Sequence, residues 1–220
     1  MLRRAIHFAS YNFVLSRRRT RTVRADGFRL TVRPTVFHPR YFVASEFFSR
    51  FVTQLDLRDR IVLDVGTGSG IIALSAARAG AANVVAVDIN PNAALSAREN
   101  AHTHGFADRM SVVCGDLLSA LAPQAKFDVI LCNPPFFPEE PIDVADRAWH
   151  AGPGYRDIRA LFGQAHARLA PGGRFYLLLS SDSDLGLIGS LIEQAGFRAR
   201  LVGRKPLLIE SLVLFELRQA

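Results

Sequence analysis

The sequence predicts an α/β protein built around a doubly wound, mostly parallel sheet of seven strands. From residue 61 onwards, apolar segments of strand length alternate with segments of helical apolar spacing, an alternation typical of βαβ units. Glycine and proline clusters such as Ala170-Pro171-Gly172-Gly173 end these segments. With 220 residues, of which 49% are hydrophobic, the chain suffices for one core with a short N-terminal extension.

Residues 1–50 form this extension, which we expect to lie over the substrate cleft of a domain spanning residues 51–220. The mixture of arginines and apolar residues in 1–20 predicts a short amphipathic helix. Asp26-Gly27, between two alternating segments, predicts a hairpin over 21–33, and the prolines that follow predict a loop. An Arg-rich, acid-free start is also typical of transit peptides, and this alternative stays open.

Charge is unevenly distributed along the chain. Residues 1–50 hold 11 arginines against Asp26 and Glu46, a balance of +9, whereas the remaining residues carry a balance of −2. A basic arm beside a near-neutral body favours docking to an anionic partner, RNA or a ribonucleoprotein first. Because Lys126 and Lys205 are the only lysines, an arginine-rich composition without a docking role is the alternative.

The later elements follow in chain order. Residues 41–55 place Phe47, Phe48 and Phe51 on one side of a predicted helix, a stripe typical of core packing. Pro91 suits the first turn of a later helix. The predicted strands are 61–65, 83–88, 110–114, 127–132, 174–180, 198–202 and 211–217. The predicted helices are 69–79, 91 to about 105, 117–121, 155–169 and 183–195.

Several classes of protein are disfavoured by the composition. No apolar stretch approaches the roughly 18 to 20 residues that a membrane span requires. Cys114 and Cys132 both fall in strands predicted to be buried, so we expect core residues rather than a disulfide, in a reducing cytoplasm. The histidines and cysteines lack the spacing of a metal site, so no metal is expected.

A glycine-rich turn follows the first strand of the alternating region. Asp64-Val65-Gly66-Thr67-Gly68-Ser69-Gly70 ends that strand and opens a helix. Glycines there allow a tight turn and a close approach of the backbone to a ligand. Dinucleotide-binding turns share such glycines, but this one is Gly-x-Gly-x-Gly rather than Gly-x-Gly-x-x-Gly and begins with an acidic residue.

Acidic residues also end the next two strands. Asp88 is placed to bind two ribose hydroxyls, and Asp116 is placed to accept a hydrogen bond from an exocyclic adenine amine. Each aspartate alone is more often a solvated turn former. Because parallel strands end at one edge of a sheet, where ligands bind in open α/β folds, the set together predicts a nucleoside site.

The loop Asn133-Pro134-Pro135-Phe136 follows the fourth strand of this region. Two prolines cannot continue a sheet ladder, so the strand must end in a rigid turn. An amide side chain, a proline carbonyl and an aromatic ring are the groups needed to grip a planar nitrogen that carries two N–H groups. We therefore take Asn133, Pro134, Pro135 and Phe136 as the candidate catalytic loop.

The glycine turn and the strand-end aspartates resemble the class I S-adenosylmethionine-dependent methyltransferases over roughly residues 55–220. The resemblance implies a Rossmann-like fold in which the turn carries the methionine part of the cofactor, Asp88 the ribose and Asp116 the adenine. Asp64 would orient the amino-acid part, through water or backbone. The implied cofactor-binding residues are Asp64, Gly66, Thr67, Gly68, Gly70, Asp88, Asp116, Leu117 and Asn133.

Asn133-Pro134-Pro135-Phe136 resembles the Asn-Pro-Pro-(Tyr/Phe) motif of amino-group N-methyltransferases. Arg147-Ala148-Trp149 and the ending Glu210–Leu214 are similar to the short HemK-type family of release-factor glutamine methyltransferases. The segment Val36–Ser45 lacks the acidic residues of that family's entry segment. On this resemblance Trp149 packs beside the acceptor loop, and a plain core tryptophan is the alternative.

The resemblance implies methylation of a protein glutamine amide, with a release factor or a ribosome-associated protein as partner. An exocyclic amine of adenine or guanine in RNA or DNA is the alternative acceptor, and a small molecule stays open. From other classes, a dinucleotide-dependent oxidoreductase and a non-catalytic cofactor-binding module are the alternatives. We expect a monomer, because the sequence shows no unusual apolar surface stripe.

Overall fold

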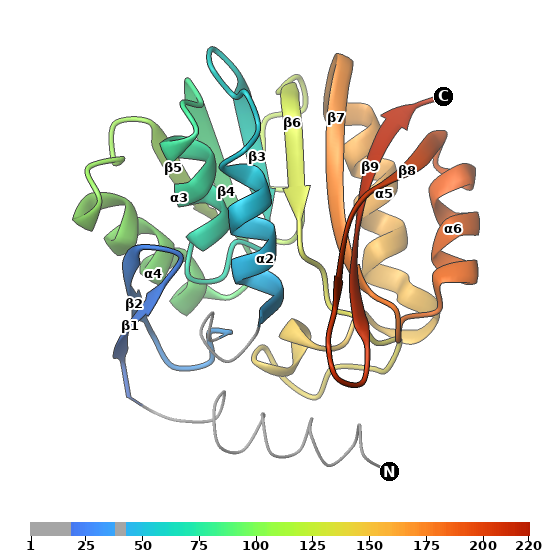
Figure 1. Ribbon diagram of the computed structural model, residues 1–220, viewed down its shortest axis with the longest axis horizontal. Helices are drawn as coiled ribbons and strands as arrows, with labels where there is room; N and C mark the ends of the chain where they lie inside the picture. The colour runs from blue at the N-terminus through green and yellow to red at the C-terminus, as the bar shows by residue number, and fades with distance from the viewer. Residues whose placement is uncertain (1–18, 38–42) are drawn as a thin grey trace.

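The computed structural model describes residues 19–37 and 43–220. Its main sheet has the strand order β5-β4-β3-β6-β7-β9-β8 (Figure 1). Strand β9 runs antiparallel to both of its neighbours, and the other neighbouring pairs are parallel. The predicted doubly wound, mostly parallel sheet of seven strands is confirmed. The strands are β3 (Ile61–Val65), β4 (Asn83–Asp88), β5 (Met110–Cys114), β6 (Phe127–Cys132), β7 (Leu169–Ser180), β8 (Phe197–Pro206) and β9 (Ser211–Gln219).

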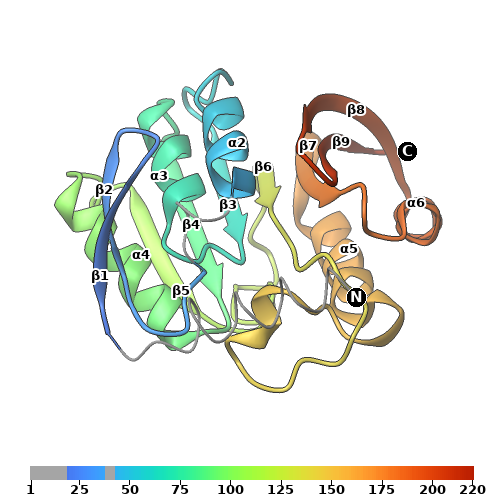
Figure 2. The same cartoon turned by 60° about the horizontal axis from the view of Figure 1, so that its bottom comes forward.

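Helices cover both faces of this sheet (Figures 1 and 2). One core layer holds side chains of α2, α3 and α4, and the other holds those of α5 and α6. Val62 belongs to the first layer and Leu63 to the second, because successive side chains of a strand point to opposite faces. The helices are α2 (Val43–Val52), α3 (Ile71–Arg78), α4 (Pro91–Thr103), α5 (Arg156–Arg168) and α6 (Leu185–Gln194).

The predicted hairpin is confirmed as β1 (Arg21–Ala25) paired with β2 (Phe28–Val32). Asp26 and Gly27 at its turn both have positive φ, 46° and 80°, as a tight two-residue hairpin turn requires. Two hydrogen bonds, of 2.7 and 2.9 Å, join the backbone of Thr31 to the Asn100 amide on α4. The hairpin is thus part of the first core layer. The helix expected within residues 1–20 lies almost wholly outside the described residues.

The strand expected at 174–180 begins earlier, at Leu169, so β7 includes the Ala170–Gly173 cluster that was expected to precede it. Two other predictions were wrong. Residues 117–121 form turns rather than a helix, because Leu117 has a left-handed φ of 49° and its backbone cannot continue a right-handed helix. Cys114 is exposed, because it lies at the end of β5, which forms one edge of the sheet. Cys132, in the central strand β6, is buried as predicted. Among the described helices, none has both the length and the apolar character needed to cross a bilayer.

Candidate active site

A cavity of about 420 Å³ opens at the carboxyl ends of the central strands. Ten of the twelve predicted site residues line it, and the two that do not are Asp64 and Gly70. Register explains why residues far apart in sequence meet here. Val65 pairs with Val87 on one side and with Cys132 on the other. The residues that directly follow Val65, Val87 and Cys132 therefore lie next to one another at the cavity. The lining predicted residues are Gly66, Thr67, Gly68, Asp88, Asp116, Leu117, Asn133, Pro134, Pro135 and Phe136.

The site lies where the strand order reverses. The chain passes from β3 outward through β4 to β5, then returns to β6 on the other side of β3. Connections on the two sides of this point diverge and leave a crevice, which is the usual ligand site of an open α/β sheet. The glycine turn after β3 and the Asn133 loop after β6 form the two banks of this crevice.

The glycine turn is shaped by left-handed backbone at alternate positions. Gly66, Gly68 and Gly70 have φ values of 73°, 57° and 86°, which favour glycine. A Cβ atom at Gly66 or Gly68 would have no heavy atom within 4 Å, so the backbone there borders open space. At Gly70 a Cβ atom would lie 3.0 Å from Cα of Ala97, so this glycine lets α3 pack against α4. The first two glycines therefore leave room for a ligand.

Asp64 holds the turn together from beneath. Its side chain is fully buried, and Oδ2 accepts hydrogen bonds from Thr67 Oγ1 at 2.6 Å and from the Ala73 N–H at 3.1 Å. Burial raises the pKa of Asp64 from 3.8 to about 7. Its other oxygen, Oδ1, has no hydrogen-bond partner among the described residues. Asp64 acts on the cavity through Thr67, which lines it, and its orienting role toward a ligand stays a prediction.

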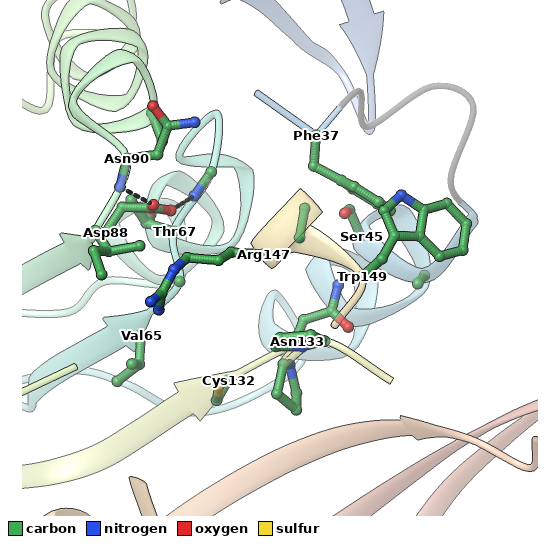
Figure 3. A pocket seen from close by; sticks show the side chains of 18 of the residues that line it. Phe37, Ser45, Val65, Thr67, Asp88, Asn90, Cys132, Asn133, Arg147 and Trp149 are labelled. Carbon is green, nitrogen blue, oxygen red and sulfur yellow. Dashed lines mark hydrogen bonds between the residues drawn. The ribbon is translucent and has the colours of Figure 1, made fainter. Parts of the chain in front are cut away.

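Asp88 ties the glycine turn to the start of α4. Its Oδ2 accepts from the Gly68 N–H at 2.8 Å and its Oδ1 from the Asn90 N–H at 2.9 Å (Figure 3). Each carboxylate oxygen keeps a further lone pair for hydroxyl donors. Burial raises the pKa of Asp88 above its ordinary value. Half-buried Asp88 thus faces the cavity as a preoriented double acceptor.

Asp116 and Leu117, shortly after β5, line the cavity on the same side as the glycine turn and Asp88. The Asp116 side chain is exposed, and Leu117 is half-buried. The left-handed φ of Leu117 costs about 1–2 kcal/mol for a residue with a Cβ atom. Such strain is found where neighbouring structure holds a side chain in place. Here it places Leu117 in the cavity wall beside Asp116.

Asn133 faces the cavity from the opposite bank. In Figure 3 its amide projects beyond Cys132 into the space that Trp149 and Ser45 also border. The Asn133 Oδ1 atom is buried and has no hydrogen-bond partner among the described residues. An unsatisfied buried acceptor costs about 1–3 kcal/mol, so Oδ1 of Asn133, a residue that lines the cavity, is a candidate acceptor for an N–H of a ligand or for a water molecule.

Trp149 packs beside the acceptor loop, as predicted. Its ring stacks on Phe137 with centroids 6.1 Å apart and planes 7° apart, and it meets Phe37 edge-on at 5.9 Å. The Phe137 N–H donates to the Trp149 carbonyl at 3.1 Å. These three rings all line the cavity. They form a rigid apolar wall next to Asn133.

Other lining residues were not predicted. Asn90 caps α4 by accepting from the Asn92 N–H at 3.0 Å, and its Nδ2 donates to the Thr35 carbonyl at 3.0 Å. This contact brings residues 35–37 to the cavity. Arg147, from the short 3-10 helix η2 (Asp146–Ala148), also lines it and lies 3.6 Å from Asp157. The Asn90 cap before Pro91 is readable in the sequence, whereas its contact with Thr35 depends on tertiary structure.

Three comparisons with known proteins show what this chain is similar to. The family described as methyltransferase small domain matches residues 28–194. A Methanocaldococcus jannaschii protein provisionally named as a protein N5-glutamine methyltransferase is 30% identical over 197 residues, covering 87% of this chain and 96% of that protein. The tRNA1(Val) (adenine(37)-N6)-methyltransferase of Shewanella baltica is 32% identical over 128 residues, covering 56% of this chain and 54% of that protein.

Solved structures share the fold. The 16S rRNA N2 G1207 methyltransferase of T. Thermophilus, in complex with AdoMet and guanosine, superposes with a TM-score of 0.64 and 27% identity. The match covers 90% of this chain and 49% of that one. The ribosomal protein L11 methylase of Lactobacillus delbrueckii subsp. bulgaricus gives a TM-score of 0.61 at 20% identity, covering 82% of this chain and 80% of that one. The chain spans about half the length of the tRNA and rRNA enzymes that it matches.

Proposed function

Because this chain belongs to the methyltransferase small-domain family and is an S-adenosylmethionine-dependent N-methyltransferase, we propose that it methylates the side-chain amide of a glutamine in a protein. The observation that carries the proposal is the unpaired Oδ1 atom of Asn133, a cavity-lining residue directly after β6, the strand that pairs with β3 before the glycine turn. The near full-length match to a protein provisionally named for glutamine methylation supports this acceptor. The proposed substrate protein is a release factor or a ribosome-associated protein, and we propose that this chain acts on it as a monomer in the cytoplasm.

The cavity residues fit the cofactor. We propose that Gly66, Thr67 and Gly68 lie against its methionine part, where the backbone borders open space. Asp88 keeps lone pairs for the two ribose hydroxyls, and Asp116 with Leu117 borders the adenine. Bound there, S-adenosylmethionine supplies an activated methyl group on a sulfonium. Gly70 and Asp64 act indirectly, by setting the packing of α3 and the shape of the turn.

An amide nitrogen is a weak nucleophile, because its lone pair is delocalised into the carbonyl. Asn133 Oδ1 and the Pro134 carbonyl accept its two N–H groups, which fixes the direction of the nitrogen lone pair. Phe136 stacks on the planar amide, while Pro135 keeps the loop rigid. The chain's contribution is therefore orientation within an apolar enclosure, and a strong general base is not required.

The test replaces Asn133 with alanine. We expect unchanged S-adenosylmethionine binding by calorimetry and a loss of at least about 100-fold in transfer of labelled methyl to glutamine-containing proteins, because orientation is lost. Asn83→Ala is the control, since Asn83 is an exposed residue at the other end of β4. Normal transfer by Asn133→Ala would remove the proposed acceptor role.

A second candidate acceptor is an exocyclic amine of a nucleobase in RNA. Arg24 and Arg29 lie directly opposite each other on the hairpin, and both are exposed. Like charges directly opposite on neighbouring strands are destabilising, and neither arginine forms an ion pair with a described residue. The hairpin leads within a few residues to Thr35 in the cavity wall, so an RNA held there would reach the site. Relatives that act on tRNA and rRNA support this candidate.

The salt dependence of RNA binding distinguishes the two candidate acceptors, the glutamine amide and the nucleobase amine. If RNA docks on the hairpin, Arg24→Gln/Arg29→Gln should lower the slope of log affinity against log salt by about 2, because two phosphate contacts are lost. Arg159→Gln/Arg198→Gln removes the same charge from α5 and from β8 at the opposite edge of the sheet and serves as the control. If the slope of log affinity for RNA against log salt is the same in both variants, glutamine is the only supported acceptor. If labelled methyl appears in RNA rather than in protein, the nucleobase amine takes the place of glutamine as the proposed acceptor.

A further inference from the structure

The Phe136 carbonyl oxygen is held by two hydroxyl groups from distant parts of the chain. Tyr155 Oη donates to it at 3.2 Å, and Ser183 Oγ donates to it at 3.0 Å. Tyr155 and Ser183 are only 1% and 6% exposed. We propose that these hydroxyls form a clamp that sets the orientation of the Asn133–Phe136 loop for methyl transfer, and that Tyr155 and Ser183 are positioning residues. The proposal rests on the role given above to that loop.

The loop needs such a clamp because of its own composition. Pro134 and Pro135 have no N–H group, so their backbone cannot be fastened by donation. After Asn133, the Phe136 carbonyl is therefore one of the first backbone groups that neighbouring residues can hold by a hydrogen bond. The next point is the Phe137 N–H, which donates to the Trp149 carbonyl at 3.1 Å.

The clamp is itself anchored to a helix. Tyr155 Oη also accepts from the Asp184 N–H at 2.9 Å, so the phenol donates and accepts at once. Asp184 is the N-cap of α6, where its Oδ1 accepts from the Leu187 N–H at 2.9 Å. Burial raises the pKa of Tyr155 above its ordinary value, so the phenol keeps its proton for donation at neutral pH. The acceptor loop is thereby linked to the rigid start of α6.

Tyr155 adopts a costly backbone conformation to reach this position. Its φ is 57°, in the left-handed region, directly before α5. This conformation costs about 1–2 kcal/mol for a residue other than glycine. Outliers of this kind persist where the surrounding structure requires them, and they gather at functional sites. Here the surrounding requirement is the pair of hydrogen bonds made by the Tyr155 hydroxyl.

The test uses Tyr155→Phe, which removes only the hydroxyl, with Tyr176→Phe as matched control. Tyr176 is 2% exposed, and its hydroxyl donates to Glu216 at 3.1 Å on the β7–β9 pair. Wild type and variants are compared on whichever acceptor the wild type methylates. We expect Tyr155→Phe to lower kcat about 10-fold while the Kd for S-adenosylmethionine stays within about 2-fold, because misorientation weakens only the chemical step. Tyr176→Phe should leave both values unchanged.

A second readout does not depend on activity. Trp149 is the only tryptophan of the chain and stacks on Phe137, directly after the clamped carbonyl. Acrylamide should quench its fluorescence more in Tyr155→Phe and in Ser183→Ala than in wild type and Tyr176→Phe. If Tyr155→Phe does not fold, Ser183→Ala decides the matter. Unchanged kcat and unchanged quenching in the clamp variants would overturn the proposal, even if glutamine proves to be the wrong acceptor.

Discussion

Replacing Gly66 by alanine tests whether the glycine turn is shaped for a ligand or only for the fold. Gly66 has a φ of 73°, lines the cavity and would have no heavy atom within 4 Å of an added Cβ. Gly105 provides a matched control in the turn after α4, away from the cavity. Its φ is 71° and its added Cβ also meets nothing within 4 Å. The two positions thus differ in that Gly66 lines the cavity and Gly105 does not.

Because Gly66 and Gly105 have similar φ values and similar free space, the expected losses of stability and of cofactor affinity can be estimated separately. Each alanine costs about 1–2 kcal/mol of backbone strain, which for a chain of this size lowers the Tm by about 2–8 °C. This loss should be equal in Gly66→Ala and Gly105→Ala. A methyl group forced against a bound ligand costs a further 1–3 kcal/mol or so in binding, which corresponds to an increase of about 5- to 150-fold in Kd. Only Gly66→Ala should show this second loss.

Calorimetric titration with S-adenosylmethionine measures the Kd, and thermal unfolding without ligand measures the strain. The decisive quantity is the ratio of Kd values between the two variants. If Gly66→Ala and Gly105→Ala bind the cofactor equally well, the ligand does not lie against Gly66. The assignment of the turn to cofactor binding would then be wrong.

Two further predictions concern the support of the turn. Asp64 binds a proton more tightly in the folded chain, where its pKa is about 7, than at its ordinary 3.8. Its contribution to the free energy of unfolding should therefore fall as pH rises from about 4 to 7, by up to about 4 kcal/mol, and urea unfolding of Asp64→Asn should lack this decrease. Gly70→Ala should lower the free energy of unfolding by about 2–5 kcal/mol, from strain plus the contact with the Ala97 backbone, and a loss no larger than that of Gly66→Ala would contradict it.

The strands and their succession along the chain were predictable, because the apolar runs and the turns between them are local signals. Parallel strands end at one edge, so the meeting of Gly66, Asp88 and Asn133 could be expected from sequence alone. The clamp could not, because Tyr155 and Ser183 reach Phe136 across 19 and 47 positions of the chain.

The errors also have local causes. The helix expected at 117–121 has apolar spacing but too few residues to offset the nucleation of a helix, and the left-handed Leu117 prevents it. Cys114 was expected to be buried because its strand is apolar, yet sequence spacing does not say which strand lies at the edge of a sheet. Asn90 was recognisable as a cap before Pro91, but its contact with Thr35 belongs to the tertiary structure.

The reversal of strand order between β3 and β6 divides the work of the enzyme between two halves of the sheet. On the proposed assignment, one half carries the residues that bind the methyl donor and the other carries those that bind the acceptor. The two halves meet along four residue pairs, from Val62 with Val129 to Val65 with Cys132. On this assignment, substitutions in the loop after β6 would change the acceptor side, while Asp64 and Asp88 still hold the glycine turn. A fold divided in this way can exchange one recipient molecule for another over evolutionary time while its methyl source stays the same.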